Sequence, residues 1–124
     1  MQLTFSFLDG RYGIYRCSPG TDLPLSADRF LSFTRAEDEV SIVCGEGMIP
    51  EADRSEEGYV VMKLHGPFDL GVTGVLAEIS RLLADAKVPI FVISTYDTDY
   101  ILIKDSEKKR AAQALIAAGH VRTA

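Results

Sequence analysis

The 124-residue sequence has no apolar run that approaches the roughly 18 to 20 residues needed to span a bilayer. Its first residues, MQLTFSFLDG, also lack the basic segment of a signal peptide and include an early acidic residue, Asp9. We therefore expect a cytoplasmic protein that does not bind membranes. Hydrophobic residues make up 47% of the chain, which is typical of a globular protein with a packed core.

Reactive and metal-binding side chains are equally scarce. Cys17 and Cys44 are the only cysteines, and they lie too far apart in sequence for a metal motif. Without an export signal, two reduced core thiols are favoured over a disulfide. His65 and His120 are the only histidines, and neither has a partner residue at a catalytic or metal-ligand spacing. We expect no catalytic residue, no metal site and no cofactor.

Positive charge is also in short supply. The net charge is −5. Residues 1–58 hold five Arg against eleven Asp or Glu, a net charge of −6, whereas residues 59–124 have a net charge of +1. The one basic cluster, residues 108–110, is balanced by Asp105 and Glu107. Because phosphate contacts dominate binding to nucleic acids, so acidic a chain is not expected to bind them.

Residues 1–57 have the pattern of short strands and turns. Apolar residues alternate with polar ones from Leu3 to Phe7, the period of a half-buried strand. Further strands are predicted at residues 12–17, 30–34 and 40–44, and a single helical turn at residues 26–29. The stretch from Gly45 to Gly58 is rich in Gly, Pro, Glu and Asp. It is the best candidate for a linker, with a short helix near Pro50–Arg54.

Residues 58–124 have a more regular pattern. A β-rich run, Tyr59–Leu64, is followed by an apolar helical stripe that ends before Pro89. The stripe consists of Val72, Val75, Leu76, Ile79, Leu82, Leu83 and Ala86. Two buried strands, residues 90–93 and 100–103, flank a short polar segment and predict a hairpin. A second helix is expected from a cap at Asp105 or Ser106 to Gly119, followed by a short strand at residues 120–122.

The resulting order, βαββαβ, predicts an α+β fold of the ferredoxin-like type. In this fold four antiparallel strands carry both helices on one face. We expect residues 58–124 to form this domain and residues 1–57 to form a smaller, β-rich unit. A sheet with one open face and two open edges favours pairing with another sheet. The first half of the chain and a second subunit are the two candidates.

Two segments carry a resemblance to a known family. Residues 64–76, LHGPFDLGVTGVL, and residues 88–103, VPIFVISTYDTDYILI, resemble one branch of the ACT domains. That branch includes small bacterial proteins with two ACT-like units, the CASTOR-type arginine sensors and the regulatory region of aspartate kinase. The resemblance implies an ACT domain at residues 58–124 and a degenerate ACT-like unit at residues 1–57. It also implies a non-catalytic, allosteric regulatory protein that binds an amino acid between paired units, expected here as a homodimer.

The resemblance places a ligand between two loops. The first wall comprises Gly66, Pro67, Phe68, Asp69, Thr73 and Gly74. These residues lie at the start of a helix expected from Gly71, where backbone N–H groups and the helix dipole would attract a carboxylate. The second wall comprises Thr95, Tyr96, Asp97 and Thr98. There, Asp97 would pair with a cationic side chain of the ligand.

Each loop also has a purely structural explanation. Gly66-Pro67 is a turn signal, Asp69 is a candidate helix cap, and Thr95–Thr98 is an ordinary polar hairpin. The spacing of Asp97 and Asp99 matches a metal-nucleotide motif, but no phosphate-binding loop or second ligand cluster accompanies it. The alternative function is therefore an ACT-fold protein-interaction module without a functional ligand site.

Overall fold

The computed structural model describes residues 1–24 and 29–124, so the helical turn predicted at residues 26–29 lies largely outside the described residues. The chain divides into two compact units. One comprises Met1–Asp9 and Val60–Ala124 and is called the helical unit below; the other, Gly10–Tyr59, is called the strand unit. Strand β5 (Arg54–Leu64) contributes its beginning to the strand unit and its end to the helical unit.

The sheet of the helical unit contains one strand more than predicted. Its strands are β1 (Thr4–Phe7), the end of β5, β6 (Phe91–Ser94), β7 (Asp99–Lys104) and β8 (Val121–Arg122). They run in the order β6-β7-β5-β1-β8. β1 pairs antiparallel with β5 and parallel with β8, so the sheet is not purely antiparallel. The α+β class is confirmed, with β1 placed between β5 and the last strand.

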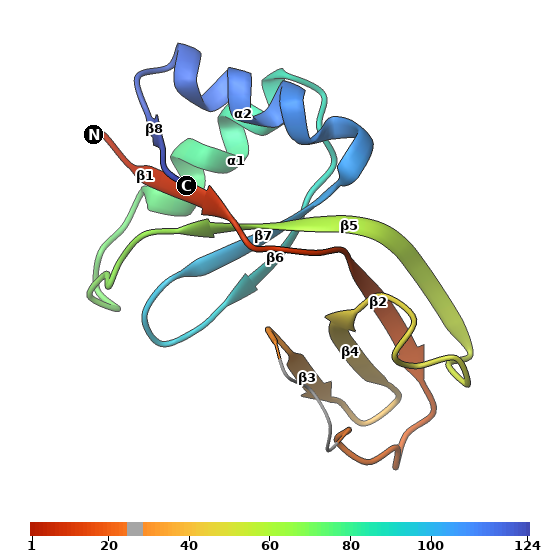
Figure 1. The fold of residues 1–124 in the computed structure, drawn as a ribbon. Helices are drawn as coiled ribbons and strands as arrows, with labels where there is room; N and C mark the ends of the chain where they lie inside the picture. The colour runs from red at the N-terminus through yellow and green to blue at the C-terminus, as the bar shows by residue number, and fades with distance from the viewer. Residues whose placement is uncertain (25–28) are drawn as a thin grey trace. The chain divides into compact units, whose positions relative to one another are not determined.

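Both helices cover the same face of this sheet, as Figure 1 shows. They are α1 (Val75–Asp85) and α2 (Lys108–Ala117), and a 3-10 turn, η1 (Asp105–Glu107), precedes α2. Ile79 and Leu83 of α1 and Leu115 of α2 are fully buried in one core with Phe5, Met62 and Leu64 of the sheet. Alternate residues of a strand point to opposite faces, so Lys63, between Met62 and Leu64, lies on the face without helices.

The first helix begins later than the sequence pattern predicted. Gly74 is its N-cap residue, with φ at 91°, a left-handed conformation that a helix interior does not accept. The first intrahelical hydrogen bond runs from the Glu78 amide to the Gly74 carbonyl, at 3.0 Å. The predicted start at Gly71 is therefore wrong, and Asp69 is not a helix cap. Val72, predicted on the buried stripe, is 50% exposed because it precedes the helix.

The strand unit is an antiparallel sheet with the order β3-β4-β2-β5. Its other strands are β2 (Tyr12–Cys17), β3 (Ser32–Arg35) and β4 (Val40–Gly45). The buried residues of its core are Tyr15, Cys17, Val40, Ile42, Cys44 and Ile49. Both cysteines are free thiols. A Cβ atom at Gly13 would lie 2.4 Å from the Tyr15 hydroxyl, so a glycine at this position makes room for the Tyr15 ring.

The units are not consecutive stretches of sequence, in contrast to the expected division into residues 1–57 and 58–124. β1 belongs to the helical unit because its backbone pairs with β5 and β8. The predicted linker from Gly45 to Gly58 also contains regular structure, since β4 extends to Gly45 and β5 already begins at Arg54. Residues 50–54 form a turn and the start of β5 rather than the predicted short helix.

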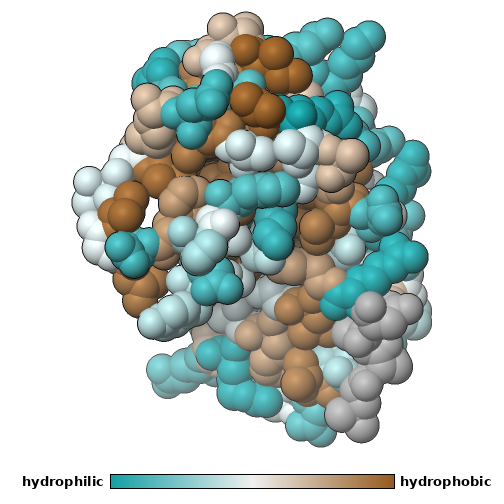
Figure 2. Space-filling model, turned by 60° about the vertical axis from the view of Figure 1, so that its left-hand side comes forward, coloured by the Kyte–Doolittle hydropathy of each residue, from teal (hydrophilic) through white to brown (hydrophobic). Residues whose placement is uncertain are grey.

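Hydrophobic side chains reach the surface at scattered positions, and on the face seen in Figure 2 they alternate with hydrophilic ones. The most exposed large ones include Leu70 at 73%, Val72 at 50% and Tyr96 at 80%. All three belong to the two loops that the sequence analysis selected. Among the described residues, none of the helices has the length and apolar character to cross a membrane.

Candidate functional site

The loop after β5 and the turn between β6 and β7 meet at the end of the helical unit's sheet. The Phe68 amide donates a hydrogen bond to the Asp97 carbonyl, at 2.8 Å. The Thr98 hydroxyl donates to the Leu64 carbonyl, at 2.6 Å, and Thr98 is only 6% exposed. Within the turn, the Thr95 amide donates to the Thr98 carbonyl, at 2.8 Å. These bonds fix the two predicted walls against each other.

Gly66 is required for this close approach. The peptide bond between Gly66 and Pro67 is cis. A Cβ atom at Gly66 would lie 2.8 Å from the Asp97 carbonyl oxygen and 2.8 Å from the Phe68 amide nitrogen. Both are backbone atoms of the loop–turn contact, so they cannot move aside without breaking it. Any larger residue would force the two walls apart.

A pocket of about 260 Å³ lies between these walls and the beginning of α1, and we call it the α1 pocket. The predicted site residues that line it are Phe68, Asp69, Gly74, Thr95, Tyr96, Asp97 and Thr98. Gly66 and Pro67 line a neighbouring pocket instead, and Thr73 is not part of either lining. Thr73 precedes α1, which begins at Val75.

The α1 pocket combines backbone donors with carboxylates. Val75, Leu76 and Ala77 line it, and their amides precede the first intrahelical hydrogen bond. The positive end of the helix dipole therefore faces this space. Asp69, Asp97 and Asp99 also line it, whereas none of the described Lys, Arg and His residues does. The pocket thus offers donors for an anionic group and three acidic residues for cationic groups.

Asp99 was not among the predicted site residues. It is the first residue of β7 and pairs directly with Ser94 of β6, whose hydroxyl donates a hydrogen bond to the Asp99 carboxylate. The signal for it was present in the sequence, because a hairpin turn of residues 95–98 places residues 94 and 99 opposite each other. The spacing of Asp99 from Asp97 matches a metal-nucleotide motif as well. Among the described residues, no group of His, Cys, Asp and Glu is arranged to hold a metal ion.

A second pocket, of about 230 Å³, lies beside the same turn and is called the sheet-face pocket below. Its lining includes Lys63, His65 and Tyr100, which sequence analysis did not assign to a site. Lys63 and Tyr100 alternate with core residues along β5 and β7, and His65 follows the core residue Leu64 at the end of β5. All three therefore lie on the face without helices. The Lys63 ammonium is 6.0 Å from the centre of the Tyr100 ring. Thr95, Asp97 and Thr98 line both pockets.

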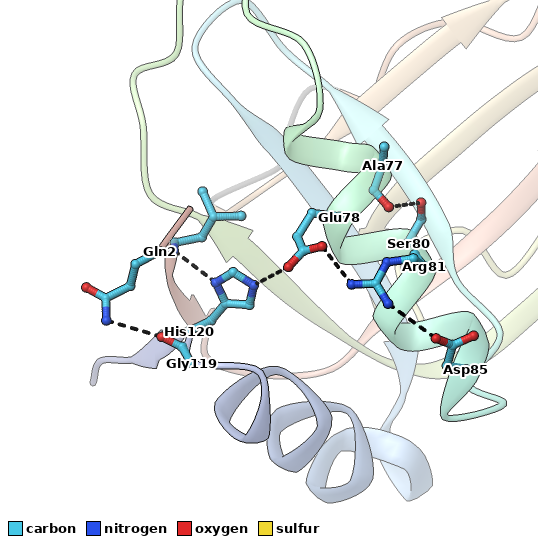
Figure 3. A network of polar contacts seen from close by, with 9 residues as sticks. Gln2, Ala77, Glu78, Ser80, Arg81, Asp85, Gly119 and His120 are labelled. Atoms are coloured by element: carbon cyan, nitrogen blue, oxygen red, sulfur yellow. Dashed lines mark hydrogen bonds and ion pairs between the residues drawn. The ribbon is translucent and has the colours of Figure 1, made fainter.

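The two histidines have different environments. His65 is exposed, and its Nε2 atom is 2.7 Å from the Ser6 hydroxyl oxygen. His120 is 3% exposed and lies between α1 and the N-terminal segment, as Figure 3 shows. The Leu3 amide donates to its Nδ1 atom at 3.0 Å, so Nε2 carries the proton and donates to the Glu78 carboxylate at 3.2 Å.

The Glu78 carboxylate also accepts a hydrogen bond from Arg81, at 2.9 Å. Arg81, and to a lesser extent His120, lower the pKa of Glu78 below its usual value. His120 therefore has a structural role, because it connects the N-terminal segment at Leu3 to α1 at Glu78.

Comparison with known proteins links these features to a family. A model of the ACT domain matches residues 54–117, more than half of the chain. A second model, of an N-terminal domain, matches residues 10–52. A solved protein from Agobacterium tumefaciens is 34% identical over 99% of this chain and 93% of its own, with a TM-score of 0.90.

Two more distant structures share the fold. A Vibrio cholerae protein of unknown function is 21% identical over 94% of this chain and 89% of its own, with a TM-score of 0.73. The regulatory subunit of aspartate kinase from Thermus flavus is 10% identical over 95% of this chain and 97% of its own, with a TM-score of 0.62. No protein with a curated description matches the sequence significantly.

Proposed function

Because the chain belongs to the ACT domain family, we propose that it is a non-catalytic regulatory protein that binds a free amino acid in the α1 pocket. The observation that carries this proposal is the lining of that pocket. Amides at the start of α1 and the acidic residues of the β6–β7 turn meet in one space of about 260 Å³. A cytoplasmic location fits a chain with two free thiols.

The groups of an α-amino acid have complementary partners in this pocket. The ligand carboxylate would accept hydrogen bonds from the amides of Val75, Leu76 and Ala77, at the positive end of the helix dipole. The ligand ammonium would pair with a carboxylate. Three acidic residues are more than one ammonium group requires, and no cationic residue in the described part of the chain lines the pocket to neutralise them. The site therefore favours an amino acid with a cationic side chain.

Signalling would proceed through a homodimer. β6 is an edge strand in the described sheet, since it pairs only with β7. Its sequence, FVIS, contains no charged residue or proline that would discourage pairing with another strand. The α1 pocket lies next to the end of this strand at Ser94. A ligand that binds one arrangement of two subunits more tightly would shift the population toward it.

A protein-interaction module without a ligand is the second candidate. It is favoured by Leu70, Val72 and Tyr96, three strongly exposed hydrophobic residues that also line the α1 pocket. Exposed apolar groups around a pocket are a common feature of protein-binding surfaces. In this case the same two loops would contact a protein partner, and no amino acid would stabilise the fold.

Thermal unfolding with each proteinogenic amino acid separates the two candidates. A ligand at about 100 times its dissociation constant should stabilise the protein by about 2.7 kcal/mol. We expect this stabilisation with arginine or lysine, and at least tenfold weaker binding in the Asp99→Asn variant. Glu37→Gln removes the same charge from an exposed turn of the strand unit and serves as the control. The absence of a shift with any amino acid at millimolar concentration would favour the interaction module.

The dimer is tested separately by light scattering after size-exclusion chromatography. We expect twice the monomer mass of 13.6 kDa in the presence of the bound amino acid. A monomer with and without ligand would contradict this part of the proposal and leave the binding measurement unaffected.

A further inference from the structure

We propose that the sheet-face pocket is a second ligand site, for a small carboxylate that carries a hydrogen-bond donor on its α-carbon. The site is separate from the α1 pocket, and the binding itself does not depend on the function proposed above. Only the communication between the two pockets, described below, rests on that function.

The charges of the two pockets differ. Of the residues that the structure describes, three acidic ones and no cationic one line the α1 pocket, whereas Lys63, His65 and one acidic residue, Asp97, line the sheet-face pocket. Lys63 and His65 are two positions apart along one strand direction, so their Cα atoms are roughly 7 Å apart and their side chains share a face. A carboxylate between them would receive a charged donor from one side and an imidazole donor from the other.

The contact of His65 with Ser6 bears on which ring nitrogen can donate to a ligand. The Ser6 hydroxyl is 2.7 Å from Nε2 and is only partly accessible, since Ser6 is 8% exposed. When this hydroxyl donates to Nε2, the imidazole proton resides on Nδ1, which becomes the donor available to a ligand. The same contact fixes the orientation of the ring at the pocket wall.

The hydroxyl groups of the turn already donate hydrogen bonds within the protein, so they are not free to donate to a ligand. The Thr98 hydroxyl donates to the Leu64 carbonyl at 2.6 Å, and the Thr95 hydroxyl donates to the Thr98 carbonyl at 3.1 Å. Lys63 and His65 can therefore donate to the ligand carboxylate. Asp97 can accept from a hydroxyl or ammonium group on the α-carbon of the ligand. The Tyr100 ring, beside the Lys63 ammonium, forms an apolar wall for the carbon chain.

The size of the pocket agrees with a small metabolite. Its volume of about 230 Å³ is below the roughly 300 to 1,000 Å³ typical of sites for drug-sized molecules. An α-hydroxy or α-amino acid with a short carbon chain fits this limit, and a nucleotide does not.

Both pockets share one wall, which links them physically. Thr95, Asp97 and Thr98 line both, and the turn that they form is hydrogen-bonded to Leu64 and Phe68. A ligand that shifts this turn in one pocket changes the shape of the other. By thermodynamic linkage, any effect of one ligand on the affinity of the other is reciprocal.

Heteronuclear NMR titration of the full chain with L-lactate and with L-alanine tests the site. The two probes share a carbon skeleton and differ in the α-hydroxyl and α-ammonium groups. We expect saturable shifts at the amides of Lys63, His65 and Tyr100 with at least one probe, and smaller shifts across the turn at Leu76 and Ala77. In Lys63→Met the affinity should fall at least tenfold, whereas Lys109→Met, an exposed lysine of α2, should bind like the wild type.

Three results would overturn the proposal. They are no saturable shift at Lys63 and His65 with up to about 10 mM probe, unchanged affinity in Lys63→Met, and equal binding of inorganic phosphate at the same residues. Asp99→Asn, which changes only the α1 pocket, keeps the two proposals distinguishable. If this variant loses arginine binding and keeps lactate binding, the result bears only on the function proposed for the α1 pocket.

Discussion

Replacing His120 with phenylalanine should destabilise the helical unit although the new ring fills nearly the same space. His120 is 3% exposed, and its Nδ1 atom is the acceptor for the amide of Leu3, itself 6% exposed. Phenylalanine would leave this amide buried without its partner, at a cost of about 1 to 3 kcal/mol. For a chain of this length, the melting temperature should fall by roughly 4 °C per kcal/mol, thus by about 4 to 12 °C.

Urea denaturation of wild type and His120→Phe measures this loss, and hydrogen exchange at the Leu3 amide locates it. Glu78→Gln is the control, because a glutamine oxygen still accepts from Nε2 and the Leu3–His120 bond is untouched. Its effect should be the smaller of the two. Equal stability of His120→Phe and wild type, or unchanged protection of the Leu3 amide, would refute the reasoning that this buried acceptor connects the N-terminal segment to α1.

Two further substitutions test the site loop and the strand unit. Gly66→Ala places a Cβ atom 2.8 Å from the Asp97 carbonyl oxygen. It should lower the free energy of unfolding by about 1 to 3 kcal/mol and weaken ligand binding in titrations. The control is Gly71→Ala, where the added Cβ lies in open space and stability should change by less than about 0.5 kcal/mol. Burial and the hydrogen bond to Glu57 raise the pKa of Tyr15 from 10.0 to about 12, so its contribution to stability is complete below pH 10 and is lost as the pH rises to 12. Tyr15→Phe should therefore show a smaller loss of stability across that pH range in denaturant titrations, and an equal loss would contradict the assignment.

The sequence predicted local elements well where periodicity was strong. The stripe from Val75 to Leu83 and the hairpin of β6 and β7 agree with the structure, because both depend on spacing within a short segment. The start of α1 could not be read in the same way. Gly71 and Gly74 are both suitable beginnings, and only the left-handed φ of Gly74 shows which one ends the loop.

The sequence predicts where strands lie better than it predicts which strands pair with each other. The alternation from Leu3 to Phe7 identifies β1, but it contains no information on which strands lie beside it. Pairing with β8, more than a hundred residues later, depends on the tertiary structure. The candidate site illustrates the same limit. The resemblance to the ACT family predicts a site at the Gly66 loop and the Thr95 turn. It does not predict Lys63, His65 and Tyr100, because only the folded sheet brings these three residues to one pocket.

The position of β1 gives the chain the topology of one domain inserted into another. The chain leaves the helical unit after Asp9 and returns at Val60, and the two ends of this excursion are adjacent there, since the Leu8 amide donates to the Val61 carbonyl at 2.9 Å. A short turn from Leu8 to Val61 would convert β1 and β5 into an ordinary hairpin. Residues 10–59 are therefore removable in principle as a module. An exchange of this module for another domain would keep the pairing of β1 with β5 in the helical unit.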